Sequence, residues 1–439
     1  MKDFLWGVST AAFQIEGDDG KQGRGKSVWD SYCEREGVIE NGDNAKITCN
    51  HYEKYQEDIA LMADLGINSY RFSTSWSRIF PEGIGKINSK GVDFYDKLID
   101  GLLEKNIQPF LTLYHWDLPQ ALSDRGGFQN PDFPNWFAEY ADFIASRYGD
   151  RVKNYCTFNE PINAIATSYY AGVFAPGHRL NREQALGCMH HMHLAHVRAG
   201  KILREKNAHV GVAMSTFEEY PAVLTDRCID EAKTQFFKRD CPLNSIDVYM
   251  DPIYLGYYPK WVLERFPDFA EKTALTREEL KDVVSTYVGY TTYSGRPILE
   301  NGQEMQRPLG VAKSVLGSIL DSNGLYWGPK FLTERYKLPL YVLENGIACA
   351  DWVEKDGCVH DTGRIDFLRQ SLEVIERLRK EDVDIRGYFV WSLLDNFEWL
   401  RGYSCRFGLI HTDYESLKRT PKDSYYFYRD YIKNIGKKV

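Results

Sequence analysis

The stretch LPLYVLENG, residues 338–346, is an apolar run that ends in a carboxylate, Glu344, with a glycine two positions later. A run without charge suits a strand that is buried on both faces, as in a parallel sheet covered by helices. Such a strand would place Glu344 at the carboxyl edge of the sheet. The fold class then depends on how often the same pattern recurs along the chain.

Seven other segments repeat this pattern and also end in polar or aromatic residues. The stretches between them show helical spacing, most clearly in residues 52–66, 90–106 and 366–381, and the stretch 276–284 begins with the capping-box pair Thr276 and Glu279. Eight alternations predict one α/β domain over residues 1–439, a (β/α)8 TIM barrel with elaborated βα loops. The seven further runs are FLWGVSTAAFQIEG (4–17), INSYRFSTSW (67–76), IQPFLTLYHWD (107–117), VKNYCTFNEP (152–161), HVGVAMSTF (209–217), STYVGYTTY (285–293) and IRGYFVWSLLDN (385–396).

A doubly wound open sheet is the alternative fold. That fold usually carries a glycine-rich phosphate-binding turn directly after its first strand. The first run here continues as FQIEGDDGKQGRG (13–25), in which the glycines have the wrong spacing and no helical pattern follows. The sequence therefore favours the barrel.

Composition narrows the class of partner. A net charge of -8 and a pI of about 5.8 argue against nucleic-acid binding, which needs a basic face. No apolar run reaches the roughly 20 residues of a membrane helix, and the opening MKDFLWG lacks the pattern of a signal peptide. We therefore expect a cytoplasmic protein without membrane association. The nine cysteines form no CxxC pair, which predicts reduced thiols, no metal site and no cofactor, while a homo-oligomer stays open.

Two of the residues that close the runs are glutamates. In such barrels the active site lies at the carboxyl ends of the strands, and Glu160 and Glu344 close the fourth and seventh runs in chain order. Two facing carboxylates are the minimum machinery of glycoside hydrolysis. A second LENG places Glu300 after SGRP, which indicates a turn and a solvated acid. The run-closing residues are Gln14, Glu16, Arg71, His115, Trp116, Asn159, Glu160, Tyr293, Glu344, Asn345 and Trp391.

The other closing residues match the surface of a sugar. A pyranose ring offers an apolar face to tryptophan and a fringe of hydroxyls to Gln, Asn, His and Glu side chains. The segments FQIEG, YHWD, FNEP and WSLLDNFEW supply this mixture of side chains after predicted strands. The sequence therefore predicts a sugar-binding rim around the paired carboxylates.

The chain resembles glycoside hydrolase family 1, the β-glucosidase and β-galactosidase group, from Phe4 to about Tyr428. The motifs that carry the resemblance are the first run, YRFSTSWSRIFPEG (70–83), LTLYHWDLPQAL (111–122), TFNEP (157–161), YYAGVFAPG (169–177), LENG (343–346) and WSLLDNFEWLRGYSCRFGLIHTDY (391–414). The resemblance implies a retaining β-glycosidase that takes a small-molecule β-glycoside, most directly a β-glucosidase acting on terminal non-reducing β-D-glucosyl residues.

The resemblance also implies roles for individual residues. Glu160 would be the general acid/base and Glu344 the nucleophile, which Arg71 and Tyr293 would keep ionised, with Trp391 as the stacking platform. The substrate-binding residues would be Gln14, His115, Trp116, Asn159, Tyr293, Trp391, Glu398 and Trp399.

The chain departs from the family pattern at several positions. Thr291 in TTYS stands where an Asn is usual, which puts a polar contact near the nucleophile in doubt, and Leu343 replaces a Thr. Ser318 stands where a rim tryptophan is usual, which predicts a wider, less aromatic aglycone site. Glu398 is retained, which favours unphosphorylated sugars, and a Glu at position 160 argues against a thioglucosidase.

Three other functions stay open. A β-galactosidase, β-fucosidase or transglycosidase would use the same site, and a non-catalytic sugar-binding protein would need only part of it. The segment MHHMHLAHV, with His190, His191, His193 and His196, suggests a metalloenzyme, but it contains no HExxH pattern. We expect these histidines to serve in helix packing and at the surface.

Overall fold

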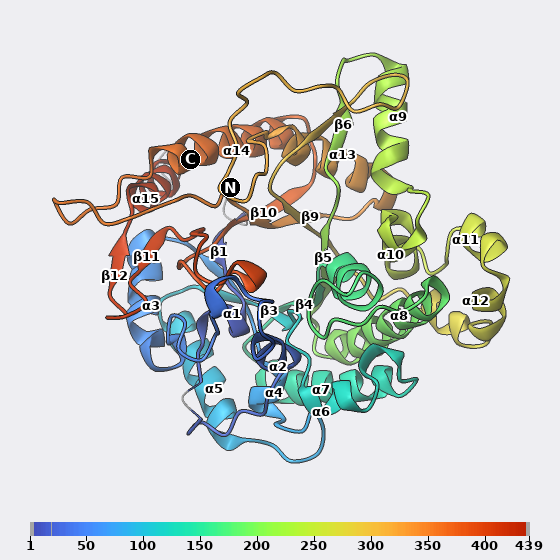
Figure 1. The fold of residues 1–439 in the computed structure, drawn as a ribbon, viewed down its shortest axis with the longest axis horizontal. Helices are drawn as coiled ribbons and strands as arrows, with labels where there is room; N and C mark the ends of the chain where they lie inside the picture. Colours follow the sequence, from blue (N-terminus) through green and yellow to red (C-terminus); the bar gives the residue numbers. More distant parts are fainter. Residues whose placement is uncertain (1–3, 19, 436–439) are drawn as a thin grey trace.

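The computed structural model describes residues 4–18 and 20–435, and eight parallel strands close into a barrel (Figure 1). Around the barrel the strand order is β1-β10-β9-β7-β5-β4-β3-β2, and each of the eight apolar runs supplies one strand. The (β/α)8 barrel is therefore confirmed. The barrel strands are β1 (Leu5–Ser9), β2 (Ser69–Ser73), β3 (Gln108–Tyr114), β4 (Asn154–Asn159), β5 (His209–Ser215), β7 (Val288–Thr292), β9 (Leu340–Asn345) and β10 (Ile385–Trp391).

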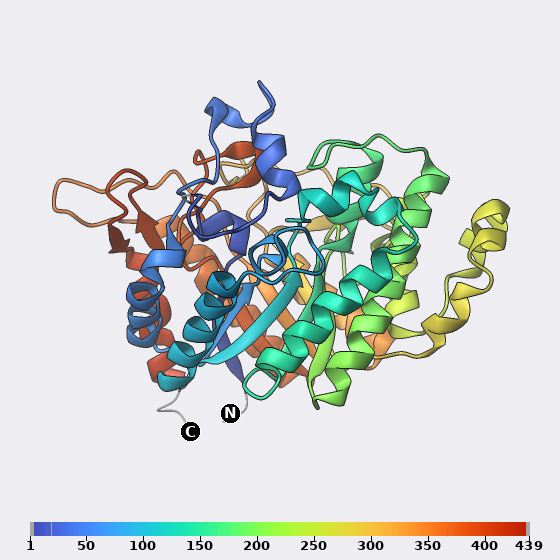
Figure 2. The same ribbon diagram turned by 90° about the horizontal axis from the view of Figure 1, so that it is seen from below.

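Helices surround the barrel, and the loops after the strands build one end of it. In Figure 2 the segments that follow β1, in dark blue, and β10, in red, gather on the same side of the barrel. Short strands β6 (Glu219–Pro221) and β8 (Arg296–Ile298) pair with each other, as do β11 (Ile410–Thr412) and β12 (Arg419–Pro421). The helices are α1 (Ala12–Ile15), α2 (Val28–Cys33), α3 (His51–Leu65), α4 (Trp76–Ile79), α5 (Ser89–Glu104), α6 (Gln120–Asp124), α7 (Phe133–Tyr148), α8 (Arg182–Glu205), α9 (Asp226–Phe237), α10 (Ile246–Tyr254), α11 (Lys260–Arg265), α12 (Pro267–Lys272), α13 (Asn323–Tyr336), α14 (Thr362–Lys380) and α15 (Asp423–Ile435).

The helices at α3, α5 and α14 match the apolar spacing of the sequence. The predicted end of α3 is also confirmed, because Gly66 takes a left-handed φ of 80° and its N–H donates to the carbonyls of Met62 and Ala63. The predicted capping box is wrong. Residues 276–281 form a 3-10 helix, and the Thr276 hydroxyl donates to the carbonyl of Thr273 instead of capping a helix.

A cluster of strand side chains fills the interior of the barrel. Leu343, which stands where the resemblance leads us to expect a threonine, is fully buried in this cluster. The departure at position 343 therefore changes packing inside the barrel and leaves the polar contacts of Glu344 in place. The cluster contains Leu5, Phe110, Cys156, Ala213, Tyr287, Leu343 and Phe389.

All nine cysteines are free thiols, and most of them are buried, as the sequence predicts. Among the described residues, no helix combines the length and the apolar character that crossing a membrane would require.

A buried group of charges anchors the segment that follows β10. Lys422 is fully buried, and its Nζ donates to Asp351 at 2.5 Å and to Asp395 at 2.7 Å. Arg406 donates to Asp395 at 2.7 Å, and Arg364 donates to Asp351 at 2.7 Å. Asp395 lies in the same segment as Glu398, so these ion pairs help to place one side of the candidate site.

Replacing Lys422 by methionine should therefore destabilise the protein. The side chain keeps its length, but two buried carboxylates lose a cation, so we expect the free energy of unfolding to fall by about 3–5 kcal/mol. Lys281→Met is the control, because the Lys281–Glu278 pair is 68% exposed on both sides and should contribute at most about 1 kcal/mol. Urea denaturation measures the free energy of unfolding of both variants. Equal losses of stability in Lys422→Met and Lys281→Met would contradict the role given to Lys422.

Candidate active site

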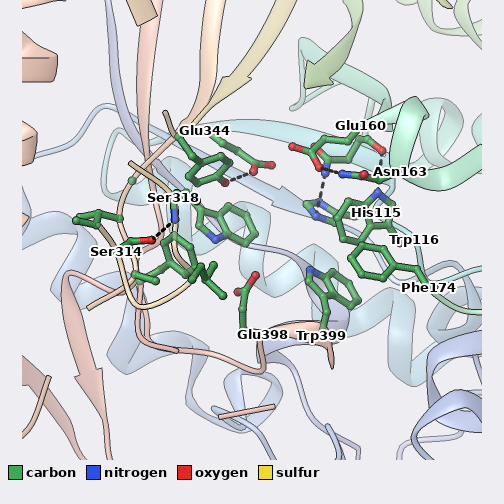
Figure 3. A pocket seen from close by; sticks show the side chains of 18 of the residues that line it. His115, Trp116, Glu160, Asn163, Phe174, Ser314, Ser318, Glu344, Glu398 and Trp399 are labelled. Atoms are coloured by element: carbon green, nitrogen blue, oxygen red, sulfur yellow. Dashed lines mark hydrogen bonds between the residues drawn. The ribbon is translucent and has the colours of Figure 1, made fainter. Parts of the chain in front are cut away.

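A cavity of about 220 Å³ opens at the carboxyl ends of the barrel strands (Figure 3). Glu160 follows β4 and Glu344 lies in β9, and both line this cavity. Figure 3 shows these two glutamates on one side of the cavity and Glu398 with Trp399 on another. The predicted site residues that line the cavity are His115, Trp116, Asn159, Glu160, Tyr293, Glu344, Trp391, Glu398 and Trp399.

Glu344 is held by donors on both carboxylate oxygens. Arg71 Nη1 donates to Oε1 at 2.6 Å, and the Tyr293 hydroxyl donates to Oε2 at 2.5 Å. Arg71 is itself fully buried and donates from Nη2 to Asn159 Oδ1 at 2.6 Å. One of these donors is a guanidinium, and a hydrogen bond from a charged donor is stronger than one from a neutral donor. Arg71 and Tyr293 therefore lie where the sequence places them, against Glu344.

Glu160 has a different environment, with neutral donors only. The Thr291 hydroxyl donates to Oε1 at 2.7 Å, and Asn163 Nδ2 donates to Oε2 at 2.6 Å. Burial and the charge of Glu344 together raise the pKa of Glu160 to about 7. At neutral pH this carboxyl therefore holds a proton part of the time.

The backbone at Glu160 is unusual for a glutamate, with a left-handed φ of 41° directly before Pro161. A π-helix over Asn163–Tyr170 follows and supplies the Asn163 amide. Residues held in such sparsely populated conformations cluster at functional sites. The sequence predicts neither the π-helix nor the contact with Asn163. Thr291, which the sequence singles out as leaving a contact near the nucleophile in doubt, donates instead to Glu160.

Two polar side chains at this end of the barrel have a buried atom without a hydrogen-bond partner. Gln14 Nε2 donates to Glu398 Oε2 at 3.2 Å, while Gln14 Oε1 is buried without a hydrogen-bond partner. His115 Nε2 accepts from Asn159 Nδ2 at 3.1 Å, and its Nδ1 is also buried without a partner. Burial and the charge of Arg71 hold the pKa of His115 well below its usual value, so the ring is neutral. His115 lines the cavity, and the unpartnered atoms of both side chains can form further hydrogen bonds.

The aromatic side chains form one continuous wall. Trp391 stacks on His115 with ring centroids 5.7 Å apart, and Trp399 lies 4.7 Å from Trp116. Trp116 Nε1 donates to the carbonyl of Asn159 at 3.0 Å, which fixes its ring. Beside this wall, burial and the charge of Glu344 raise the pKa of Glu398 to about 8.

Three residues that the sequence analysis singled out, Glu16, Asn345 and Glu300, do not line the cavity. Glu16 accepts from Arg78 at 2.6 Å and from Tyr95 at 2.6 Å, which makes it a structural acid behind the site. Asn345 donates to the carbonyl of Thr292 and accepts from the Tyr388 hydroxyl. Glu300 lies in a turn outside the cavity, as predicted, and accepts from Thr225 at 2.6 Å.

Several cavity residues come from loops and carry no sequence signal. Ser318, where the sequence predicts a missing rim tryptophan, does line the cavity, close to Ser314. The remaining wall is largely apolar. Its residues lie in loops or, for Asn163, in the π-helix, and they were not predicted because these segments lack the period of a strand or an α-helix. They are Asn163, Phe174, Ser314, Leu316, Leu320, Gly346, Ile347, Ala348 and Phe407.

The histidines of α8 are packing residues. His196 bonds to the hydroxyls of Thr157 and Ser285, and His193 bonds to the hydroxyl of Tyr258. His190, His193 and His196 are buried, which lowers the pKa of each ring. The predicted packing role is therefore confirmed. Across residues 4–18 and 20–435, no group of three or more His, Cys, Asp or Glu side chains has an arrangement suited to a metal ion.

Known proteins share this fold and align with this sequence over nearly its whole length. The model for glycosyl hydrolase family 1 matches residues 1–437. A 1,4-β-D-glucan glucohydrolase of Thermotoga neapolitana is 40% identical over 441 residues, which cover 99% of this chain and 98% of that protein. β-Glucosidase A of Thermotoga maritima is 40% identical over 445 residues, which cover 99% and 97%. A solved structure of the family 1 β-glucosidase from Thermotoga maritima superposes with a TM-score of 0.90 at 40% identity, covering 99% and 98% of the two chains.

Proposed function

The chain belongs to glycosyl hydrolase family 1, and from that premise we propose that it is a β-glucosidase that hydrolyses terminal β-D-glucosyl residues with retention of configuration. The observation that carries this proposal is the contrast between two carboxyl groups in one cavity. Glu344 has donors on both oxygens, one of them a guanidinium, whereas Glu160 has neutral donors and a pKa raised to about 7. One group is thus suited to attack and the other to proton donation.

In the first step Glu160 would donate its proton to the glycosidic oxygen while Glu344 attacks the anomeric carbon. The bond to the leaving group breaks, and a glycosyl ester forms on Glu344. The ester removes the negative charge that helps to raise the pKa of Glu160. Glu160 would then be the base that takes a proton from water, and water would release the sugar with the same anomeric configuration.

The glycone would lie between the aromatic wall and the unpartnered polar atoms. Trp391 would stack on the apolar face of the ring, and Asn159, beside the acid, would bond the 2-hydroxyl. Gln14 Oε1 and His115 Nδ1, both buried without partners, are suited to other ring hydroxyls. Glu398 would bond the 4- and 6-hydroxyls, and among the described residues no lysine or arginine lines the cavity to hold a 6-phosphate, which supports unphosphorylated substrates.

A β-galactosidase activity is the second candidate. A solved structure of the Thermotoga maritima β-glucosidase holds galacto-hydroximolactam, and that enzyme is 40% identical to this chain. Gluco and galacto sugars differ at one ring hydroxyl, so the contacts proposed here would accept both. A transglycosidase would use the same two glutamates, but the glycosyl group would pass from the ester on Glu344 to a sugar hydroxyl and not to water. A non-catalytic sugar-binding protein has no need of two opposed carboxyl environments.

Azide rescue tests the two glutamate roles. Glu344→Gly should lose nearly all hydrolysis of 4-nitrophenyl β-D-glucoside, and added azide should restore turnover with the α-glucosyl azide as product. Glu160→Ala should be rescued to the β-glucosyl azide, because azide then attacks the ester on Glu344. Product stereochemistry by proton NMR gives the result. An inert wild type would contradict the proposed function, and exchanged azide anomers would contradict the assignment.

We further propose that the site prefers bulky or branched aglycones to unbranched cello-oligosaccharides. Ser318 and Ser314 leave room at a rim that is otherwise apolar, with Leu316 about 40% exposed beside them. A wide apolar entrance accepts an aryl group by area burial, without demanding the hydroxyl contacts of a second glucose.

Ser318→Trp should narrow this entrance. We expect kcat/KM for a bulky aryl glucoside to fall roughly tenfold relative to that for cellobiose, since steric discrimination in apolar pockets has this size. Ser416→Trp, at an exposed serine of the β11–β12 turn, is the control and should leave the ratio unchanged. Steady-state kinetics on the aryl glucoside and on cellobiose measures this ratio for each variant. Comparable kcat/KM values of the wild type for the two substrates would count against the preference.

A further inference from the structure

Glu218 lies just after β5 and outside the cavity wall, and its carboxylate holds the segment that follows β7. One oxygen, Oε1, accepts three hydrogen bonds: from the Thr292 hydroxyl at 2.8 Å, the Tyr293 N–H at 2.5 Å and the Ser294 N–H at 3.1 Å. Three consecutive residues thus converge on one atom. Hydrogen bonds to an ionised acceptor are roughly twice as strong as those between neutral groups.

The middle residue of this segment is the one that touches Glu344. Tyr293 donates from its hydroxyl to Glu344 Oε2 at 2.5 Å, while its N–H is fixed by Glu218. The position of the phenol depends on the backbone at Tyr293. The ring is rigid and only two side-chain torsions separate it from the backbone, so a backbone shift also moves the hydroxyl. Glu218 therefore acts on Glu344 through one intervening residue.

The same carboxylate also reaches the aglycone rim. Ser294, whose N–H bonds to Glu218, donates from its hydroxyl to the carbonyl of Ile319 at 2.8 Å. Ile319 lies between Ser318 and Leu320, which both line the cavity. Glu218 thus joins the two sides of the site that contact the sugar and its leaving group.

The conformation of Glu218 shows that this arrangement is maintained against a cost. Its φ is 63°, in the left-handed region that glutamate rarely adopts. Such strain persists only where the surrounding contacts determine it, and it concentrates at functional sites. Burial raises the pKa of Glu218 above its usual value, and the three donors oppose that shift, which matches a carboxylate kept for its hydrogen bonds.

The neighbouring Glu219 shows what a purely structural acid looks like here. It is fully buried and bonds to Arg296 at 3.1 Å and to Arg239, so its charge is neutralised by cations. Within residues 4–18 and 20–435, Glu218 accepts from no lysine or arginine, and its partners are one hydroxyl and two backbone N–H groups. The two adjacent glutamates therefore have different tasks.

We infer that Glu218 is a positioning residue for the nucleophile: by clamping residues 292–294 it sets the Tyr293 hydroxyl against Glu344, and through Ser294 it ties the aglycone rim to the same point. This inference rests on the proposed two-glutamate mechanism. It assigns Glu218 no contact with the substrate.

A double-mutant cycle between Glu218 and Tyr293 tests the clamp. Glu218→Leu should lower kcat for 4-nitrophenyl β-D-glucoside about 100-fold, the size expected for a small misplacement near the reacting atoms, with little change in KM. Tyr293→Phe should cause a comparable loss. If Glu218 acts through Tyr293, the double variant should be no slower than the slower single variant, since the second change removes nothing further. Losses that multiply would overturn the inference.

Conservative and matched variants separate positioning from folding. Glu218→Gln keeps an acceptor oxygen and should recover at least tenfold of the kcat lost in Glu218→Leu. Glu219→Gln alters an equally placed buried acid that does not touch residues 292–294, so its kcat should stay within about twofold of wild type while its melting temperature falls. An equal kcat loss in Glu219→Gln and Glu218→Leu would show a general packing effect and overturn the clamp.

Inhibitor binding keeps this test separate from the proposed function. Wild type that fails to cleave any β-glycoside would contradict the proposed function alone. The double-mutant cycle would then use the dissociation constant of deoxynojirimycin in place of kcat. Calorimetry measures this constant for each variant without turnover. Coupled effects of Glu218→Leu and Tyr293→Phe on this constant support the clamp, and independent effects overturn it.

Discussion

The proposed mechanism depends on the repulsion between Glu160 and Glu344, two of the three carboxyl groups that line one poorly solvated cavity. Two like charges in a low-dielectric site cannot both ionise freely, so one group must be stabilised as the anion and the other must carry a proton. Arg71 and the Tyr293 hydroxyl donate to Glu344, whereas Glu160 accepts only from Thr291 and Asn163 and its pKa rises to about 7. This asymmetry is what distinguishes the attacking group from the acid in our account.

The barrel makes this arrangement possible at little cost to the rest of the protein. Parallel strands deliver their last residues to one edge, so side chains far apart in sequence converge on a single cavity. The positions are then fixed by contacts behind the wall: Arg71 joins Glu344 to Asn159, and Lys422 anchors Asp395 in the segment that carries Glu398. The proposed clamp by Glu218 belongs to the same supporting layer. Precision in the cavity is thus set in part by buried polar groups that lie behind its wall.

Much of this was predictable from sequence because strands carry a strong signal. All eight barrel strands follow from largely apolar runs, and Arg71, Glu160, Glu344 and Trp391 follow from their positions at strand ends. The parts that failed are local. Thr276 does not cap a helix, because the chain there tightens into a 3-10 turn, and the hydrogen bond from Thr291 to Glu160 was not predicted. Asn163, Leu316 and Glu218 lie in a π-helix or in loops, where neither period nor motif reports which way a side chain points.

The most direct test of the account is the pKa of Glu160 before and after Glu344 loses its charge. Carbon-13 NMR on protein labelled at the glutamate carboxyls would follow Glu160 in the free protein and after a 2-deoxy-2-fluoro-β-glucoside has esterified Glu344, with Glu160→Gln used to assign the signal. The account predicts a pKa of about 7 in the free protein and a fall of one unit or more, on the order of 1.4 kcal/mol, in the ester. An unchanged pKa, or a Glu160 already ionised in the free protein at pH 5, would contradict it.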